Sequence, residues 1–82
     1  MNYTESAEYA FDLLEHFYQL HHNMILCVGK ENLIIYIPEK IYALLVCIDE
    51  KGKKSFPTTF REIKIQVYTG STIIFALKED KR

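Results

Sequence analysis

Apolar residues recur with helical spacing through the first part of the chain. Plotted on a helical wheel, those between Thr4 and His22 form one continuous arc of about 200°, and the opposite side is acidic and polar. Thr4 is a suitable N-cap, and the acids of the first turns suit the positive end of the helix dipole. The pattern therefore predicts an amphipathic helix over residues 4–22.

The apolar arc is wider than this helix needs to cover one sheet. A surface helix packs through a stripe of about 100°, so part of the arc is left to meet something else. A homodimer through this helix or a partner protein would cover it; alternatively, the loop Ser55–Phe60 folds over the excess. The candidate partner-binding residues are three apolar and four acidic side chains of this helix: Tyr9, Leu13, Leu20, Glu5, Glu8, Asp12 and Glu15.

Two short apolar runs follow the helix. They are Met24–Val28 and Leu33–Ile37, and the segment Gly29–Asn32 separates them. This spacing is typical of a hairpin of two strands. Neither run alternates cleanly between apolar and polar residues, so we expect both faces of these strands to be covered.

The segment Pro38–Lys51 fits two kinds of structure. Pro38 suits the first position of a helix, and the apolar positions within Ile41–Ile48 recur on one helical face, which favours a helix. The same unbroken apolar run is compatible with a buried strand. In that case Asp49–Lys54 forms a hairpin turn.

The end of the chain shows the clearest strand pattern. Apolar and polar residues alternate from Ile63 to Tyr68, which predicts a strand with one solvated face. Gly70 and Ser71 then turn the chain into a second strand, Thr72–Leu77, and the pair is predicted as a hairpin. Residues 78–82 form a charged, frayed tail.

These elements predict one small α+β domain over residues 1–82. The N-terminal helix packs on an antiparallel sheet in the order α-β-β-α-β-β; the alternative is one helix on a five-stranded antiparallel sheet. The hydrophobic content of 49%, with three glycines and two prolines, opposes disorder. No apolar run reaches the roughly 20 residues of a membrane span, and no secretion signal opens the chain, so we expect a cytoplasmic protein without membrane contact.

Cysteine and histidine are the residues to consider first for metal or redox chemistry. Cys27 and Cys47 each lie in an apolar run, so we expect buried, free thiols. The donors His16, His21 and His22, with Cys27, are suitable for zinc. The histidine side chains diverge around the predicted helix instead of converging, and we therefore predict no metal site.

No arrangement typical of catalysis stands out. The serines occupy cap or turn positions, and the acid pairs Asp49-Glu50 and Glu79-Asp80 lie in turn-like or terminal sequence, where carboxylates are usually solvated. The three glycines are scattered singly, so no phosphate-binding loop is present. We expect a protein that is not an enzyme and binds no cofactor.

Charge is divided unevenly along the chain. Residues 1–50 hold eight acids and two lysines, and residues 51–82 hold three acids and eight basic residues. The basic half therefore offers an alternative function, nucleic-acid binding. Its candidate residues are Lys51, Lys53, Lys54, Lys64 and Tyr68. The net charge of −1 argues against it.

A non-enzymatic protein-interaction domain is the favoured function. The chain is rich in isoleucine, lysine, glutamate and tyrosine and has no tryptophan, which is typical of AT-rich genomes such as those of low-GC bacteria and their phages. An acidic helix can imitate nucleic-acid phosphate. The sharper hypothesis is thus an inhibitor, encoded by a phage or mobile element, that binds a host defence protein. In the plain alternative, the acids only solvate a surface helix.

Overall fold

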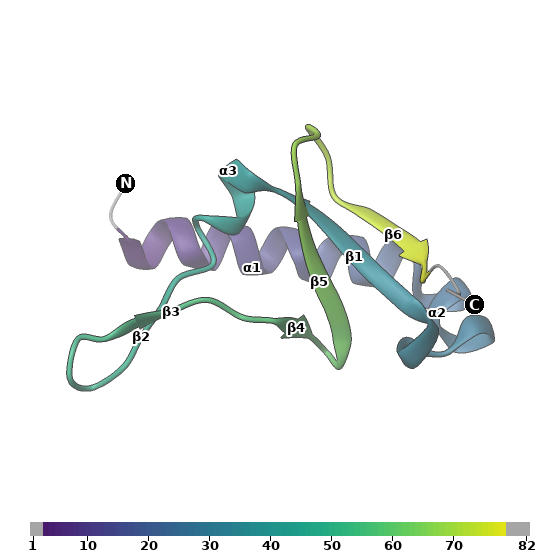
Figure 1. The fold of residues 1–82 in the computed structure, drawn as a ribbon, viewed down its shortest axis with the longest axis horizontal. Coiled ribbons are helices and arrows are strands. Elements are labelled where there is room, and N and C mark those ends of the chain that lie inside the picture. Colours follow the sequence, from purple (N-terminus) through teal and green to yellow (C-terminus); the bar gives the residue numbers. More distant parts are fainter. Residues whose placement is uncertain (1–2, 79–82) are drawn as a thin grey trace.

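A long helix, α1, lies across one face of a four-stranded sheet (Figure 1). The computed structural model describes residues 3–78. In chain order the elements are α1 (Tyr3–Leu20), α2 (His22–Val28), the 3-10 helix η1 (Lys30–Asn32), β1 (Leu33–Pro38), α3 (Glu39–Tyr42), β2 (Cys47–Ile48), β3 (Lys54–Ser55), β4 (Thr59–Phe60), β5 (Ile63–Tyr68) and β6 (Ile74–Leu77). The predicted α+β class is confirmed. The predicted frayed tail, Lys78 excepted, lies outside the described residues.

The helix α1 matches its predicted span within two residues. It begins at Tyr3, so Thr4 lies inside the helix and not at its N-cap. Its inner face is fully buried at Ala10 and Leu14 and almost fully at Tyr18, and this face forms one core with the sheet. The core is completed from the strands and the loop before β2, chiefly by Leu33, Ile35, Ile37, Leu45, Ile63 and Phe75.

The sheet is mixed, with strand order β4-β5-β1-β6. β1 runs parallel to β5, with Ile35 beside Ile65, and antiparallel to β6, with Ile35 beside Phe75. β5 and β6 are therefore separated by β1, and the predicted hairpin between them is wrong. β1 is uncharged and almost wholly apolar, so a central position, paired on both sides, removes more apolar surface from water than an edge position would.

The run Met24–Val28 is helical, so the predicted hairpin with Leu33–Ile37 is also wrong. Only Ile25 of α2 is buried, whereas Leu26 and Cys27 are exposed. One-sided burial with neighbours turned outward fits a helical period. The helix ends at Gly29, which has φ 92° and donates its N–H to the carbonyl of Ile25 at 2.9 Å.

The ambiguous segment Pro38–Lys51 combines parts of both expectations. A helix does follow Pro38, but α3 makes a single turn and ends at Tyr42. The chain then extends, and β2 pairs with β3 as a separate two-stranded sheet. Asp49 forms the turn of this hairpin, where its carboxylate accepts N–H bonds from Lys51 at 2.9 Å and Lys53 at 2.8 Å. Both residues of β2 are exposed, whereas the strand alternative predicted a buried strand.

The loop between β4 and β5 carries backbone strain. Phe60 and Ile63 are paired, so Arg61 and Glu62 form a two-residue turn, and their φ angles are 47° and 72°. Two-residue turns with positive φ at both positions favour asparagine and glycine, because a Cβ atom is crowded there. The structure holds this turn against α1 through Arg61, as described below.

Glu62→Gly should therefore stabilise the fold. Glycine adopts positive φ freely, whereas other residues pay about 1–2 kcal/mol there, and glycine's greater freedom in the unfolded chain offsets part of that gain. We expect the free energy of unfolding, measured by urea titration, to rise by about 0.5–1 kcal/mol. Glu62→Ala, which removes the same side chain but keeps the Cβ atom, is the control. An equal gain in both variants would show that the strain is not the cause.

Candidate functional site

The face of the sheet opposite α1 is the most distinctive surface of the described residues. In Figure 1 the strands β5 and β1 lie in front of α1, and no helix of residues 3–78 crosses in front of them. Side chains of the two adjacent strands β5 and β1 and of the residue after β6 line an open depression of about 530 Å³ there. We call this surface the open face and define it by Ile34, Tyr36, Lys64, Gln66, Tyr68 and Lys78.

Two tyrosines form the aromatic part of the open face. Tyr36 comes from the middle of β1 and Tyr68 from the end of β5. Their ring centroids are 5.8 Å apart with an interplanar angle of 67°, which is an edge-to-face contact. Both rings are half-buried. They therefore offer partly exposed aromatic surface at neighbouring positions on a rigid sheet.

The Tyr68 ring is held in place by the loop that follows it. Its hydroxyl donates a hydrogen bond to the backbone carbonyl of Thr72. The ring also lies against Gly70, where a Cβ atom would overlap it. Glycine at this position thus leaves room for the ring to fold over the loop, and a larger residue would displace it.

Two lysines share the open face with the tyrosines, at the end nearer the start of β1, and the lining of the depression contains no acid. Lys64 lies beside Ile34 in the register of β5 and β1, and Lys78 follows the end of β6. Both lysines are exposed, as is Gln66 between Lys64 and Tyr68. The open face is thus locally basic and aromatic although the chain as a whole carries a net charge of −1.

The structure separates the predicted nucleic-acid residues into two groups. Lys64 and Tyr68 lie on the open face. Lys51, Lys53 and Lys54 lie on the exposed β2–β3 hairpin, which projects away from the four-stranded sheet in Figure 1. The five residues predicted together therefore do not form one site.

The predicted partner-binding residues of α1 have different environments. Leu13 is half-buried and packs on the core. Tyr9 and Leu20 are 57% and 64% exposed, so part of the wide apolar arc is uncovered. The loop 55–60 covers another part, because Phe60 meets Tyr18 edge-to-face at 6.2 Å. Four acids were also named, and Glu5, Glu8 and Asp12 are exposed while Glu15 is half-buried.

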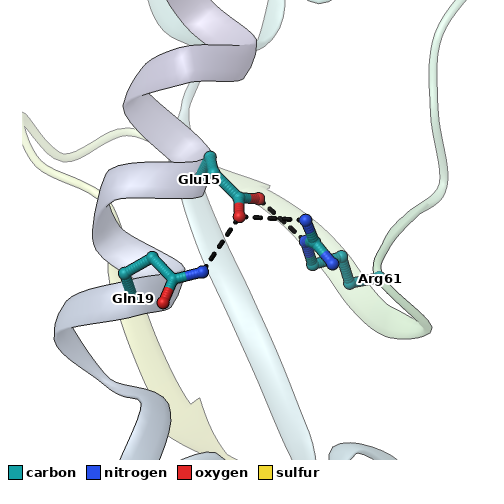
Figure 2. Close-up of polar contacts among 3 residues, drawn as sticks. All are labelled: Glu15, Gln19 and Arg61. Atoms are coloured by element: carbon teal, nitrogen blue, oxygen red, sulfur yellow. Dashed lines mark hydrogen bonds and ion pairs between the residues drawn. The ribbon is translucent and has the colours of Figure 1, made fainter.

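Glu15 is committed to an ion pair within the chain (Figure 2). Arg61 donates from Nε and Nη2 to its two carboxylate oxygens at 2.8 and 2.9 Å, and Gln19 donates at 3.1 Å. The Arg61 hydrogen bonds are the largest cause of a Glu15 pKa below its ordinary value of 4.5. Because Arg61 lies 5.0 Å from the ring centroid of Tyr18 as well, this pair joins the strained turn to α1.

The residues considered for metal and redox chemistry do not converge. Within residues 3–78 no three histidine, cysteine or acidic side chains are grouped so that they could hold a metal ion. His21 stacks on Phe75 at 4.9 Å, and its Nδ1 lies 2.8 Å from the carbonyl oxygen of Phe17. Cys27 and Cys47 are free, as expected, but both are exposed, so the expected burial is wrong. Each lies in an apolar run of which only some residues are buried: Ile25 near Cys27, and Leu45 and Val46 before Cys47.

Three comparisons were made with known proteins. The chain matched no protein-family model, no curated protein and no solved structure. A search of the described residues for a helix both long and apolar enough to cross a membrane found none. The cytoplasmic location remains a prediction.

The sequence patterns missed Tyr36, Lys78 and Gln66 as site residues. Gln66 belongs to the recognised alternation of Ile63–Tyr68, which marked one solvated face. Tyr36 was assigned to a strand covered on both faces. The missing fact was the parallel pairing of β1 with β5, which places Tyr36 opposite Gln66.

The ion pair predicts a pH-dependent stability. The pKa of Glu15 is lowered on folding, so its stabilising effect is complete above the unfolded-state pKa and is lost as the pH falls through the folded-state value. We expect Glu15→Gln to be less stable than the parent at neutral pH, and the difference to shrink as the pH falls below the ordinary glutamate pKa of 4.5. Added salt should also reduce it, because both side chains are partly exposed.

Urea unfolding of both proteins across this pH range measures the difference in free energy. Glu8→Gln is the control, since it removes an exposed acid from the same helix. A difference between parent and Glu15→Gln that persists unchanged at low pH would contradict the assignment to the ion pair.

Proposed function

We propose that this protein is a non-enzymatic binding module and that its open face binds single-stranded nucleic acid. The observation that carries the proposal is the pair Tyr36 and Tyr68, which shares with Lys64 and Lys78 a sheet surface that no helix of residues 3–78 crosses. The proposal keeps the nucleic-acid function expected from the basic half of the chain but moves its centre from the lysine-rich hairpin to the sheet.

The tyrosines supply the stacking part of such a site. Every base has a π-face, so aromatic side chains on a sheet can stack successive bases without reading their sequence. The two rings project from adjacent strands, and Tyr68 is fixed by Thr72 and Gly70. A ring that is already ordered loses less conformational entropy on binding than a mobile one.

The lysines supply the electrostatic part. Lys64 and Lys78 lie together at one end of the open face, beyond Tyr36 toward the start of β1, where the sugar-phosphate backbone of a strand stacked on the tyrosines could continue. A single strand fits better than a duplex, because in a duplex the bases are already stacked on each other and their faces are not accessible. Gln66 adds an exposed amide for hydrogen bonding.

The affinity for a fluorescein-labelled oligothymidylate, measured by fluorescence anisotropy at low salt, tests the proposal. Loss of one stacked base costs about 1–3 kcal/mol, so Tyr36→Ala and Tyr68→Ala should each raise the dissociation constant about 5- to 150-fold. Tyr9→Ala is the matched control, because Tyr9 is exposed on α1, away from the open face. Equal affinities in all three variants, or no binding by the parent, would refute the proposal.

The salt dependence tests the lysines separately. For single strands the slope of log affinity against log salt changes by about 0.7 for each phosphate contact. Lys64→Gln should therefore reduce the slope by about that amount. Lys51→Gln, on the exposed hairpin, should leave it unchanged. Similar reductions in both variants would mean that binding follows overall charge and not the open face.

A protein partner bound through α1 is the second candidate. The specific observation that favours it is the exposure of Tyr9 and Leu20 on the helix that also presents Glu8 and Asp12. The inhibitor hypothesis, in which a phage or mobile-element protein imitates phosphate to block a host defence protein, depends on this surface. Glu15 contributes less to it, because Arg61 already neutralises that charge.

Charge reversal separates this candidate from the first. Glu8→Lys with Asp12→Lys should leave the fold intact and abolish capture of a specific protein from a low-GC bacterial lysate treated with nuclease. The same variant should retain oligothymidylate binding. Unchanged capture by the reversed variant would exclude the acidic helix as the contact surface.

A further inference from the structure

The strand β6 is an edge of the four-stranded sheet. It pairs with β1 on one side, and no strand of residues 3–78 pairs with its other side. An unpaired edge presents backbone N–H and C=O groups that can add a strand from another chain. The outer edge of β6 is therefore a surface with a defined hydrogen-bonding requirement.

The direction of these backbone groups follows from one hydrogen bond. Lys78 donates its N–H at 2.9 Å to the carbonyl of the residue that precedes β1. Backbone groups alternate in direction along a strand, so those of Ala76 and Ile74 also point toward β1. Phe75 and Leu77 consequently direct their N–H and C=O groups away from β1, toward the open edge.

The opposite edge of the sheet is protected. β4 has two residues, follows Pro57 closely and ends at the charged turn of Arg61 and Glu62. Short strands, proline and charge are the usual means of preventing edge pairing. β6, Ile74–Leu77, contains neither a charge nor a proline. Only one of the two edges is thus open to another strand.

Exposed apolar side chains accompany this open edge. Ile74 is 41% exposed and Leu77 is 63% exposed. Leu77 pairs with the buried Leu33 and so lies on the α1 side of the sheet, whereas Ile74 pairs with Tyr36 and lies on the open face. A strand added beside β6 would cover apolar surface on both sides of the sheet.

We propose that β6 pairs antiparallel with β6 of a second copy of this chain, centred on Phe75. The outward backbone groups of Phe75 would then bond each other across a twofold axis, and Leu77 would pair with Ile73 of the second copy. The antiparallel direction places the two Lys78 side chains at opposite ends of the pair. A parallel pair would place these like charges side by side, which is unfavourable.

The paired sheets form one continuous open surface. Strands are spaced about 4.8 Å apart, so the two β1 strands, each with its Tyr36, would be about 14 Å apart across the axis. Binding of nucleic acid across this joint surface rests on the proposed function, whereas the pairing of the β6 strands does not. If both hold, longer oligothymidylates that span the two copies should bind more tightly than short ones.

Sedimentation equilibrium over a range of concentrations measures the pairing. The contact through one four-residue strand is small, so we expect the average mass to rise from monomer toward dimer at high micromolar concentration. Leu77→Lys should remain a monomer throughout. Leu20→Lys is the matched control, because it makes the same change at a leucine of similar exposure on α1 and should dimerise like the parent.

A parent protein that stays monomeric at all these concentrations would overturn the proposal. Loss of the dimer in Leu20→Lys but not in Leu77→Lys would overturn it in favour of a dimer through α1. Failure of oligothymidylate binding with a Leu77-dependent dimer would refute only the proposed function.

Amide hydrogen exchange of the parent tests the same contact without a substitution. The N–H groups of Ile74 and Ala76 bond to β1 and should be protected at every concentration. Those of Phe75 and Leu77 should exchange quickly in the monomer and gain protection as the dimer forms. Rapid exchange of Phe75 and Leu77 in a sample shown to be dimeric would exclude the β6 contact.

Discussion

Leu33, Ile35 and Ile37 of β1 have no solvent exposure, and the arrangement of the other elements depends on their burial. Removing each such side chain from water contributes about 1.5–3 kcal/mol, which is large against the net stability of a small domain. Their strand must therefore lie where α1 covers one face and where both edges are paired. β5 and β6, adjacent in sequence, are held apart because β1 occupies the place between them.

The same strand joins the core to the candidate site. Side chains alternate between the two faces, so the residues between the buried ones, Ile34 and Tyr36, emerge on the open face. β5 repeats the pattern, with Ile63 and Ile65 inside and Lys64 and Gln66 outside. The core fixes the register, and the register fixes which open-face side chains are neighbours. Substitutions on the open face therefore leave the core side chains unchanged.

Local periodicity determined what could be read from the sequence. α1 and β5 were predicted because their apolar residues recur clearly at periods of 3.6 and 2. The run Met24–Val28 is too short for its apolar pattern to distinguish a helix from a strand. Its helical form becomes evident only in the fold, where one side of it is buried. The pairing of β1 with β5 joins segments far apart in the chain, which no local pattern encodes. Tyr36 was missed as a site residue because of this long-range pairing. The exposure of Cys27 was missed because the run Met24–Val28 is short.

A net charge of −1 opposes nucleic-acid binding when it is taken for the whole chain, and the fold changes the weight of that argument. Interactions between exposed charges are largely screened beyond about 8–10 Å at physiological salt. The exposed acids Glu8 and Asp12 lie on α1, which covers one side of the sheet, and Lys64 and Lys78 lie on the other. An approaching phosphate therefore encounters the lysines of the open face, while the acids act mainly on solutes near α1. For a sheet covered on one side only, the charge of each face is a better guide to its ligand than the charge of the whole chain.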